Sequence, residues 1–121
     1  MGYRLDHVQL AIPAGGEDLA DAFYVDLLGF VPEEKPPVLA ARGGRWYRRD
    51  DAIVHLGVEA DFRPAHKAHP ALAVDDYEEL IGRLRSAGYV VRDDHELSTR
   101  RCYVEDPHGN RLELIETTSV R

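Results

Sequence analysis

The sequence predicts an α+β fold in which a β-α-β-β-β module occurs twice in tandem. The first observation is that the order of strand-like and helix-like segments in the first half of the chain recurs in the second half. The second is that corresponding positions are almost equally spaced: His7 precedes His69 by 62 residues, and His55 precedes Glu113 by 58 residues. Offsets that differ by a few residues are what loop insertions between two related modules would produce.

The elements of the first module follow from local patterns. Alternating apolar and less apolar residues over 7–12 predict a half-buried strand, which Pro13 ends. Residues 17–28 carry apolar side chains at helical spacing, and Gly29 suits the left-handed conformation that often follows a helix. Three further strands are expected at 30–33, 45–49 and 53–58.

The second module repeats this order. Residues 69–74 alternate like the first strand, and Asp76 with Glu79 predicts a helix N-cap and its capping-box partner. Gly88 marks the end of this helix. Strands are expected at 89–92, 101–105 and 111–116, with a turn at 106–110.

The two modules span residues 3–59 and 69–117, and a linker at 60–68 joins them. A module of this size buries too little surface to be stable alone. We therefore expect both modules to pack together as a single domain over residues 1–121.

Composition and charge narrow the function classes. The 121 residues are 44% hydrophobic and 31% charged, which is typical of a globular domain. A net charge of −7 argues against nucleic acid and anionic membrane surfaces as partners. No uncharged run approaches the roughly 20 residues needed to span a bilayer, and the single cysteine, Cys102, excludes an internal disulfide. We expect a cytoplasmic protein whose partner is a small molecule.

Strand alternation separates an aliphatic face, expected to pack against the helices, from a more polar face that suits the lining of a cavity. Four side chains with metal-binding atoms fall on the polar face: His7, His55, His69 and Glu113. Three imidazoles and a carboxylate are good ligands for Zn, Ni, Fe or Mn. The pattern predicts one divalent metal ion on a rigid sheet. His55 remains open between a fourth ligand, a residue that supports the ligands and a substrate contact.

Arginines and aromatic residues occupy equivalent strands of the two modules. The candidates for substrate contact are Tyr47, Arg49, Arg101 and Tyr103. Guanidinium groups would attract an anionic substrate toward the cavity. The alternative interpretation is a solvated strand surface with aromatic packing, and the sequence does not separate the two.

Two motifs accompany the double module: His7-Val8 at its start and Asp-Pro-His-Gly-Asn-Arg-Leu-Glu-Leu at 106–114. Together they resemble the vicinal oxygen chelate superfamily, which includes glyoxalase I, extradiol dioxygenases, and the fosfomycin- and bleomycin-resistance proteins. The resemblance implies two modules that form a curved mixed sheet around a divalent metal, with helices on the outer face.

The resemblance also implies roles for individual residues. His7, His69 and Glu113 match the metal ligands on the first, fifth and last strands of the family. His55 stands at the fourth-strand position, where glyoxalase I has a glutamate. Glu113 would remain a ligand throughout, or leave the metal transiently to act as the catalytic base.

The implied activity is that of a divalent-metal-dependent enzyme acting on a small oxygen-rich substrate. Glyoxalase-like isomerase or lyase chemistry is the first expectation, and dioxygenase chemistry is the second. The alternative is a non-catalytic drug- or metabolite-binding protein of the bleomycin-resistance type, whose acidic character the net charge of −7 matches. The metal-ligand set favours the enzyme, and both interpretations imply a homodimer.

Overall fold

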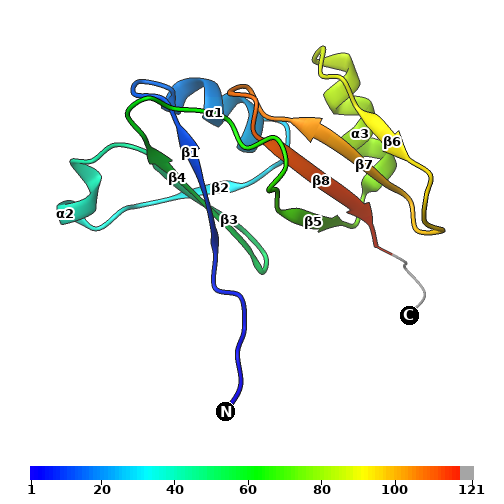
Figure 1. The fold of residues 1–121 in the computed structure, drawn as a ribbon, viewed down its shortest axis with the longest axis horizontal. Helices are drawn as coiled ribbons and strands as arrows, with labels where there is room; N and C mark the ends of the chain where they lie inside the picture. The colour runs from blue at the N-terminus through cyan, green and yellow to red at the C-terminus, as the bar shows by residue number, and fades with distance from the viewer. Residues whose placement is uncertain (118–121) are drawn as a thin grey trace. The chain divides into compact units, whose positions relative to one another are not determined.

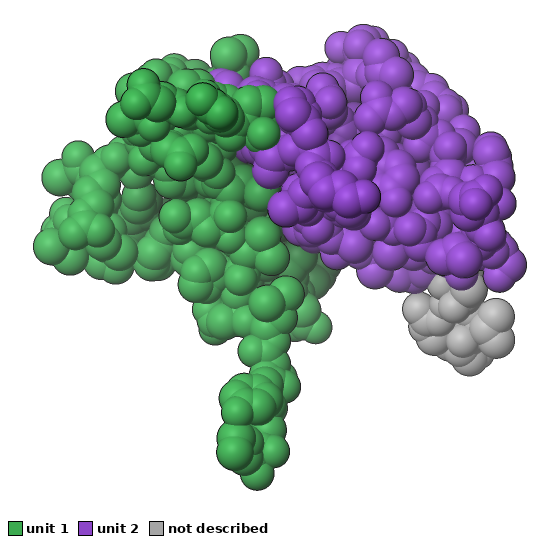
Figure 2. Space-filling view, in the orientation of Figure 1, with its two compact units in different colours: residues 1–64 green, residues 65–121 purple. Residues whose placement is uncertain are grey.

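The computed structural model describes residues 1–117, which form three helices and eight strands (Figure 1). The chain divides into two compact units, residues 1–64 and residues 65–121 (Figure 2). The division falls within the predicted linker at 60–68. We call residues 1–64 unit 1 and residues 65–121 unit 2.

Unit 1 contains one four-stranded sheet with the order β1-β4-β3-β2. The parallel pairing of β1 with β4 requires a crossover, which the intervening helices and strands supply. The other neighbouring strands run antiparallel. The elements are β1 (Val8–Ile12), α1 (Glu17–Tyr24), β2 (Val31–Glu33), α2 (Pro37–Ala40), β3 (Arg45–Arg49) and β4 (Ala52–Val58).

Unit 2 repeats this topology with the order β5-β8-β7-β6, in which β5 and β8 pair in parallel. The tandem β-α-β-β-β modules and the α+β class predicted from the sequence are therefore confirmed. The elements are β5 (Ala71–Val74), α3 (Tyr77–Ser86), β6 (Arg92–Asp94), β7 (Arg101–Glu105) and β8 (Arg111–Glu116).

Some element bounds differ from the prediction at helix ends. Helix α1 ends at Tyr24, because the backbone amides of Leu28 and Phe30 bond back to carbonyls near the helix end in wide turns. Strand β6 starts at Arg92 rather than at residue 89, since the amide of Tyr89 closes the end of α3. The short helix α2 was not expected from the sequence.

The N-cap of α3 is only partly as predicted. Asp76 occupies the cap position, but its side chain makes no capping hydrogen bond. Its backbone carbonyl accepts the first intrahelical bond, from Leu80. The predicted capping box of Asp76 with Glu79 is therefore wrong.

Most of the aliphatic strand faces are buried as predicted, but Val58 is exposed, and Leu72 and Val74 of β5 are only half-buried. In unit 1, Leu10, Ile12, Val54 and Leu56 are buried together with Phe23 of α1. Unit 2 buries the corresponding set from β7, β8 and α3: Leu80, Ile81, Leu84, Cys102, Val104, Leu112 and Leu114. Among the described residues, no helix is long and apolar enough to cross a membrane.

The turn at 106–110 anchors the chain that leads into β5. The Asp106 carboxylate accepts hydrogen bonds from two backbone amides of the turn. The Oδ1 atom of Asn110, a residue only 1% exposed, accepts a hydrogen bond of 2.9 Å from the Ala65 amide. The Ala65 carbonyl in return accepts one from the Arg111 amide, also 2.9 Å long. These bonds tie the start of unit 2 to the start of β8.

The first prediction concerns Gly44, which has φ +90° and whose added Cβ would lie 2.1 Å from the Leu56 carbonyl oxygen. Gly88 has φ +91°, but a Cβ there meets nothing within 4 Å. Gly88→Ala should therefore lower the free energy of unfolding only by the strain of placing an alanine in the left-handed backbone conformation, about 1 kcal/mol. Gly44→Ala adds a clash with β4 and should lower the free energy of unfolding by about 3 kcal/mol or more. Urea unfolding followed by circular dichroism measures both, and equal losses would contradict the close approach.

The Asn110 side chain links the turn at 106–110 to the Ala65 amide. Asn110→Ala leaves the half-buried Ala65 amide and the buried Asp106 carboxylate without this partner, so the free energy of unfolding should fall by about 2 kcal/mol relative to the wild type. The same urea experiment measures this. A loss below about 0.5 kcal/mol, the level of an ordinary surface substitution, would show that the turn does not anchor the segment.

Candidate functional site

In unit 1, the parallel pairing of β1 with β4 brings two predicted site residues together. Gln9 lies opposite His55, and His7 precedes Gln9 by two residues, so both histidines share one face of the sheet. Their rings stack with centroids 4.1 Å apart and planes inclined at 24°. Trp46, opposite His55 on β3, stacks on it at 4.2 Å and 4°.

The surroundings of the two rings decide where their hydrogens lie. Nδ1 of His7 is 2.8 Å from Oδ2 of Asp6. A carboxylate only accepts hydrogen bonds, so Nδ1 carries the hydrogen, and Nε2 of the neutral ring carries the lone pair. This hydrogen bond lowers the pKa of the Asp6 carboxyl. Burial is the larger of the causes that lower the pKa of His55, and a positive charge on His7 would act in the same direction.

In unit 2, the pairing of β5 with β8 produces the equivalent juxtaposition. Ala71 lies opposite Glu113, and His69 precedes Ala71 by two residues. Nδ1 of His69 donates a 2.8 Å hydrogen bond to the Lys67 carbonyl, while Nε2 lies 3.0 Å from Oε1 of Glu113. In the neutral ring, a lone pair on Nε2 therefore faces the lone pairs of a carboxylate. Only a cation, either a proton or a metal ion, makes that contact favourable.

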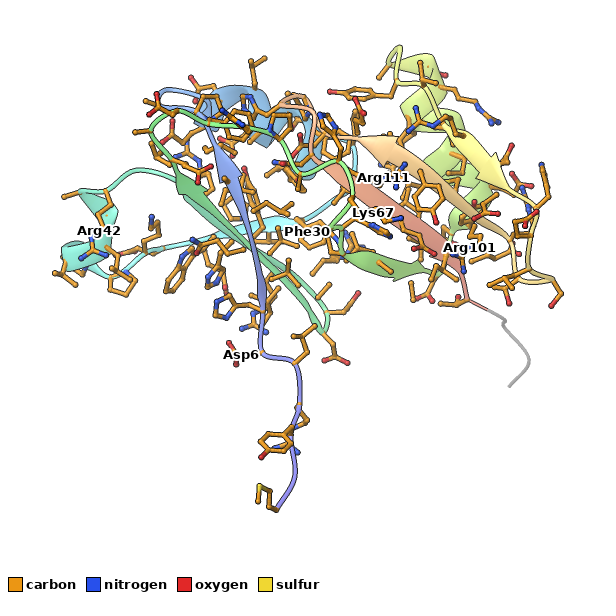
Figure 3. The ribbon with its side chains drawn as sticks, in the orientation of Figure 1. Asp6, Phe30, Arg42, Lys67, Arg101 and Arg111 are labelled. Carbon is orange, nitrogen blue, oxygen red and sulfur yellow. The ribbon has the colours of Figure 1, made fainter. Side chains whose placement is uncertain are left out.

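The second oxygen of Glu113 is held by Arg101. Nη2 of Arg101 is 3.0 Å from Oε2 of Glu113, and both side chains are largely buried. The same Nη2 lies 3.4 Å from the Tyr103 hydroxyl, and the Tyr103 ring meets His69 edge-on at 5.5 Å. Figure 3 shows Arg101 on β7 and Lys67 ahead of β5. Arg101 and Tyr103 thus lie on the face that carries Glu113, and Arg101 fixes the orientation of the carboxylate.

Tyr47, in contrast, lies on the other face of its sheet and is fully buried. Its ring stacks on Tyr24 of α1 at 5.3 Å, and its hydroxyl donates a 2.6 Å hydrogen bond to Asp21. Burial, together with this hydrogen bond, raises the pKa of Tyr47. Tyr47 is therefore a core residue that is not accessible to a ligand.

Arg49 also lies on the α1 side of β3. Its Nη1 donates a 2.7 Å hydrogen bond to the Gly29 carbonyl, just beyond the end of α1. The positions on the His55 side of β3 are Trp46 and Arg48, and Arg48 pairs with Glu33 at 3.0 Å. The register of β3 against β4 is needed to identify Trp46 and Arg48, because it makes Trp46 the partner of His55 and alternation then adds Arg48.

The predicted metal ligands form one pair in each unit. Within residues 1–117, no three His, Cys, Asp or Glu side chains come together as a group that could hold a metal ion. Unit 1 supplies His7 with His55, and unit 2 supplies His69 with Glu113. The atoms that could bind a metal through a lone pair are Nε2 of His7, the unprotonated ring nitrogen of His55, Nε2 of His69 and the carboxylate oxygens of Glu113.

Several known proteins resemble this chain in sequence and fold. It is 33% identical to a lactoylglutathione lyase of Salmonella typhimurium over 128 aligned positions, which cover 93% of this chain and 92% of that protein. A solved glyoxalase family protein from Bacillus anthracis is 41% identical, with a TM-score of 0.92 and 98% of each chain covered. The fosfomycin resistance protein FosX from Listeria monocytogenes is 14% identical and shares the fold, with a TM-score of 0.75 over 98% of this chain and 97% of that one.

The family model of the Glyoxalase/Bleomycin resistance protein/Dioxygenase superfamily matches residues 4–114, which include nearly all of both modules and all four predicted metal ligands. The duplicated β-α-β-β-β topology and the parallel pairing of the first with the last strand of each module agree with this match. The chain belongs to the Glyoxalase/Bleomycin resistance protein/Dioxygenase superfamily, the vicinal oxygen chelate proteins.

Proposed function

We propose that this protein is a divalent-metal-dependent enzyme of the glyoxalase type, which isomerises or cleaves a small oxygen-rich substrate. His7, His69 and Glu113 would hold one ion of Zn, Ni, Fe or Mn. The observation that carries the proposal is the contact of Nε2 of His69 with Oε1 of Glu113 at 3.0 Å, which places two metal-binding atoms side by side on one face of unit 2. The lactoylglutathione lyase that is 33% identical supports a lyase or isomerase over a simple binding protein.

The donor atoms suit such an ion. His7 and His69 are each held through Nδ1, one by the Asp6 carboxylate and the other by the Lys67 carbonyl. Hydrogen bonding of one ring nitrogen is the usual way in which a protein orients a metal-binding histidine. Two imidazoles and one carboxylate are acceptable to all four ions and leave positions open for substrate. When bound, the ion would polarise the substrate oxygens and stabilise the negative charge that develops on them.

Glu113 is the residue that we propose moves the proton. Arg101 holds Oε2 at 3.0 Å, so Oε1 is the oxygen turned toward His69. Oε1 would accept a proton from the substrate carbon beside a carbonyl group and return that proton to the neighbouring carbon. The net result is an isomerisation in which no atom is gained or lost.

The proposal treats residues 1–121 as one functional domain. It also includes a homodimer and a cytoplasmic location. The buried reduced thiol of Cys102 agrees with such a compartment. The exposed apolar side chains of Met1, Tyr3 and Leu5, ahead of β1, agree with a surface that a second chain covers.

The metal site predicts about one divalent ion per chain in protein reconstituted with Ni²⁺ or Zn²⁺ and then dialysed. His69→Ala removes a ligand and should lose nearly all of the bound ion. His95→Ala is the matched control, because His95 is an exposed histidine outside the site and its loss should leave the metal content unchanged. Elemental analysis measures all three proteins. Equal metal contents in the His69 and His95 variants would contradict the assignment.

The proton-transfer role predicts a loss of turnover in Glu113→Gln. The assay is conversion of the adduct of methylglyoxal and glutathione to lactoylglutathione by metal-loaded protein. We expect kcat/KM to fall by about 10²–10⁴-fold, the range typical of a lost general base. Glu105→Gln removes an exposed carboxylate on β7 and should retain wild-type activity. Metal-loaded wild type without turnover would reject glyoxalase-type chemistry on this substrate while leaving the metal site intact.

A further inference from the structure

Three aromatic rings form a continuous stack on the polar face of unit 1. Trp46 of β3 lies on one face of the His55 ring, with centroids 4.2 Å apart and planes at 4°. His7, just before β1, lies against the His55 ring at 4.1 Å and 24°. The strand register places Trp46 directly opposite His55. His55 itself is only 8% exposed, so its ring is enclosed by these neighbours.

This stacking bears on whether His55 binds the metal. A metal bound to an imidazole nitrogen lies in the plane of the ring, about 2 Å from that nitrogen. Two stacked rings whose planes are inclined at only 24° have no common in-plane point within that distance of both. One ion therefore cannot be bound by His7 and His55 while their rings keep this arrangement.

We infer that His55 is a positioning residue, whose ring holds the metal-binding ring of His7 in place, and not a metal ligand. The inference rests on the proposed metal site. Two contacts then fix His7: Asp6 holds its Nδ1 edge at 2.8 Å, and His55 supports its face. Trp46 supports His55 in turn. A ligand whose ring is locked in this way loses less conformational freedom when the metal binds.

A pair of substitutions separates the two roles of His55. His55→Phe keeps a flat ring of similar size but removes both nitrogens. His55→Gln removes the ring but keeps an amide oxygen that can bind a metal. We expect His55→Phe to bind Ni²⁺ with an affinity close to wild type, and His55→Gln to bind about 10–100-fold more weakly, as when a group supporting a ligand is lost. Isothermal titration of each protein with NiCl₂ measures this, without reliance on activity.

A second pair tests the stack from its other end. Trp46→Phe should retain Ni²⁺ affinity, whereas Trp46→Leu, which removes the flat support of His55, should weaken it in the same direction as His55→Gln. The fluorescence of Trp46, the one tryptophan of the sequence, reports whether each His55 variant is folded. This pair keeps the inference testable if a His55 variant does not fold.

The outcomes distinguish the inference from the proposed function. If the wild type binds Ni²⁺ but His55→Phe does not, or if His55→Gln binds as well as wild type, His55 is not a positioning ring and the inference is overturned. If the wild type takes up no divalent ion, the proposed function is overturned and the role of His55 falls with it. Wild-type binding that His55→Phe retains and His55→Gln weakens supports both.

Discussion

The parallel pairing between the first and the last strand of each module is the constraint on which the site depends. It sets Gln9 opposite His55 in unit 1 and Ala71 opposite Glu113 in unit 2. Because side chains alternate along a strand, a histidine two residues before each register partner points to the same face. Backbone hydrogen bonding between these strands thus places His7 beside His55 in unit 1 and His69 beside Glu113 in unit 2.

The two units use the same backbone arrangement for different physical purposes. In unit 2 the contact is ionic: Glu113 lies between His69 and Arg101, at 3.0 Å from each. In unit 1 the contact is between ring faces, with His55 enclosed by Trp46 and His7. The unit 1 pair is therefore held by the stacking of aromatic rings.

The sequence predicted most of the fold because its signals are local. Strand alternation, helical spacing and turn residues depend on neighbours along the chain, and the bounds of β3, β7 and β8 are as predicted. The predicted capping box of Asp76 with Glu79 does not form. Whether a cap side chain reaches a backbone amide depends on the local backbone geometry, which the residue pattern does not specify. The start of β6 was misplaced because closure of α3 by Tyr89 depends on how the helix ends in three dimensions.

Individual site residues were harder to predict, for a related reason. The shared face of His7 with His55, and of His69 with Glu113, could be predicted, since it needs only alternation and strand order. Residue type indicated Tyr47 as a substrate contact. Its place in the core depends on a hydrogen bond to Asp21, which lies 26 positions away in the sequence. The stack of Trp46 on His55 was missed because it needs the register of β3 against β4. The Arg101–Glu113 pair likewise depends on how β7 pairs with β8.

The repeated strand pairing also separates the identity of a side chain in the site from the backbone that presents it. Position 55 and position 113 are set by the same register, yet one holds an imidazole and the other a carboxylate. A change of residue at either position alters the chemistry of one unit and leaves the backbone pairing of both intact. In a duplicated module of this kind, the side chains of each half can change independently during evolution. New reactions can therefore arise by point substitution without a new fold.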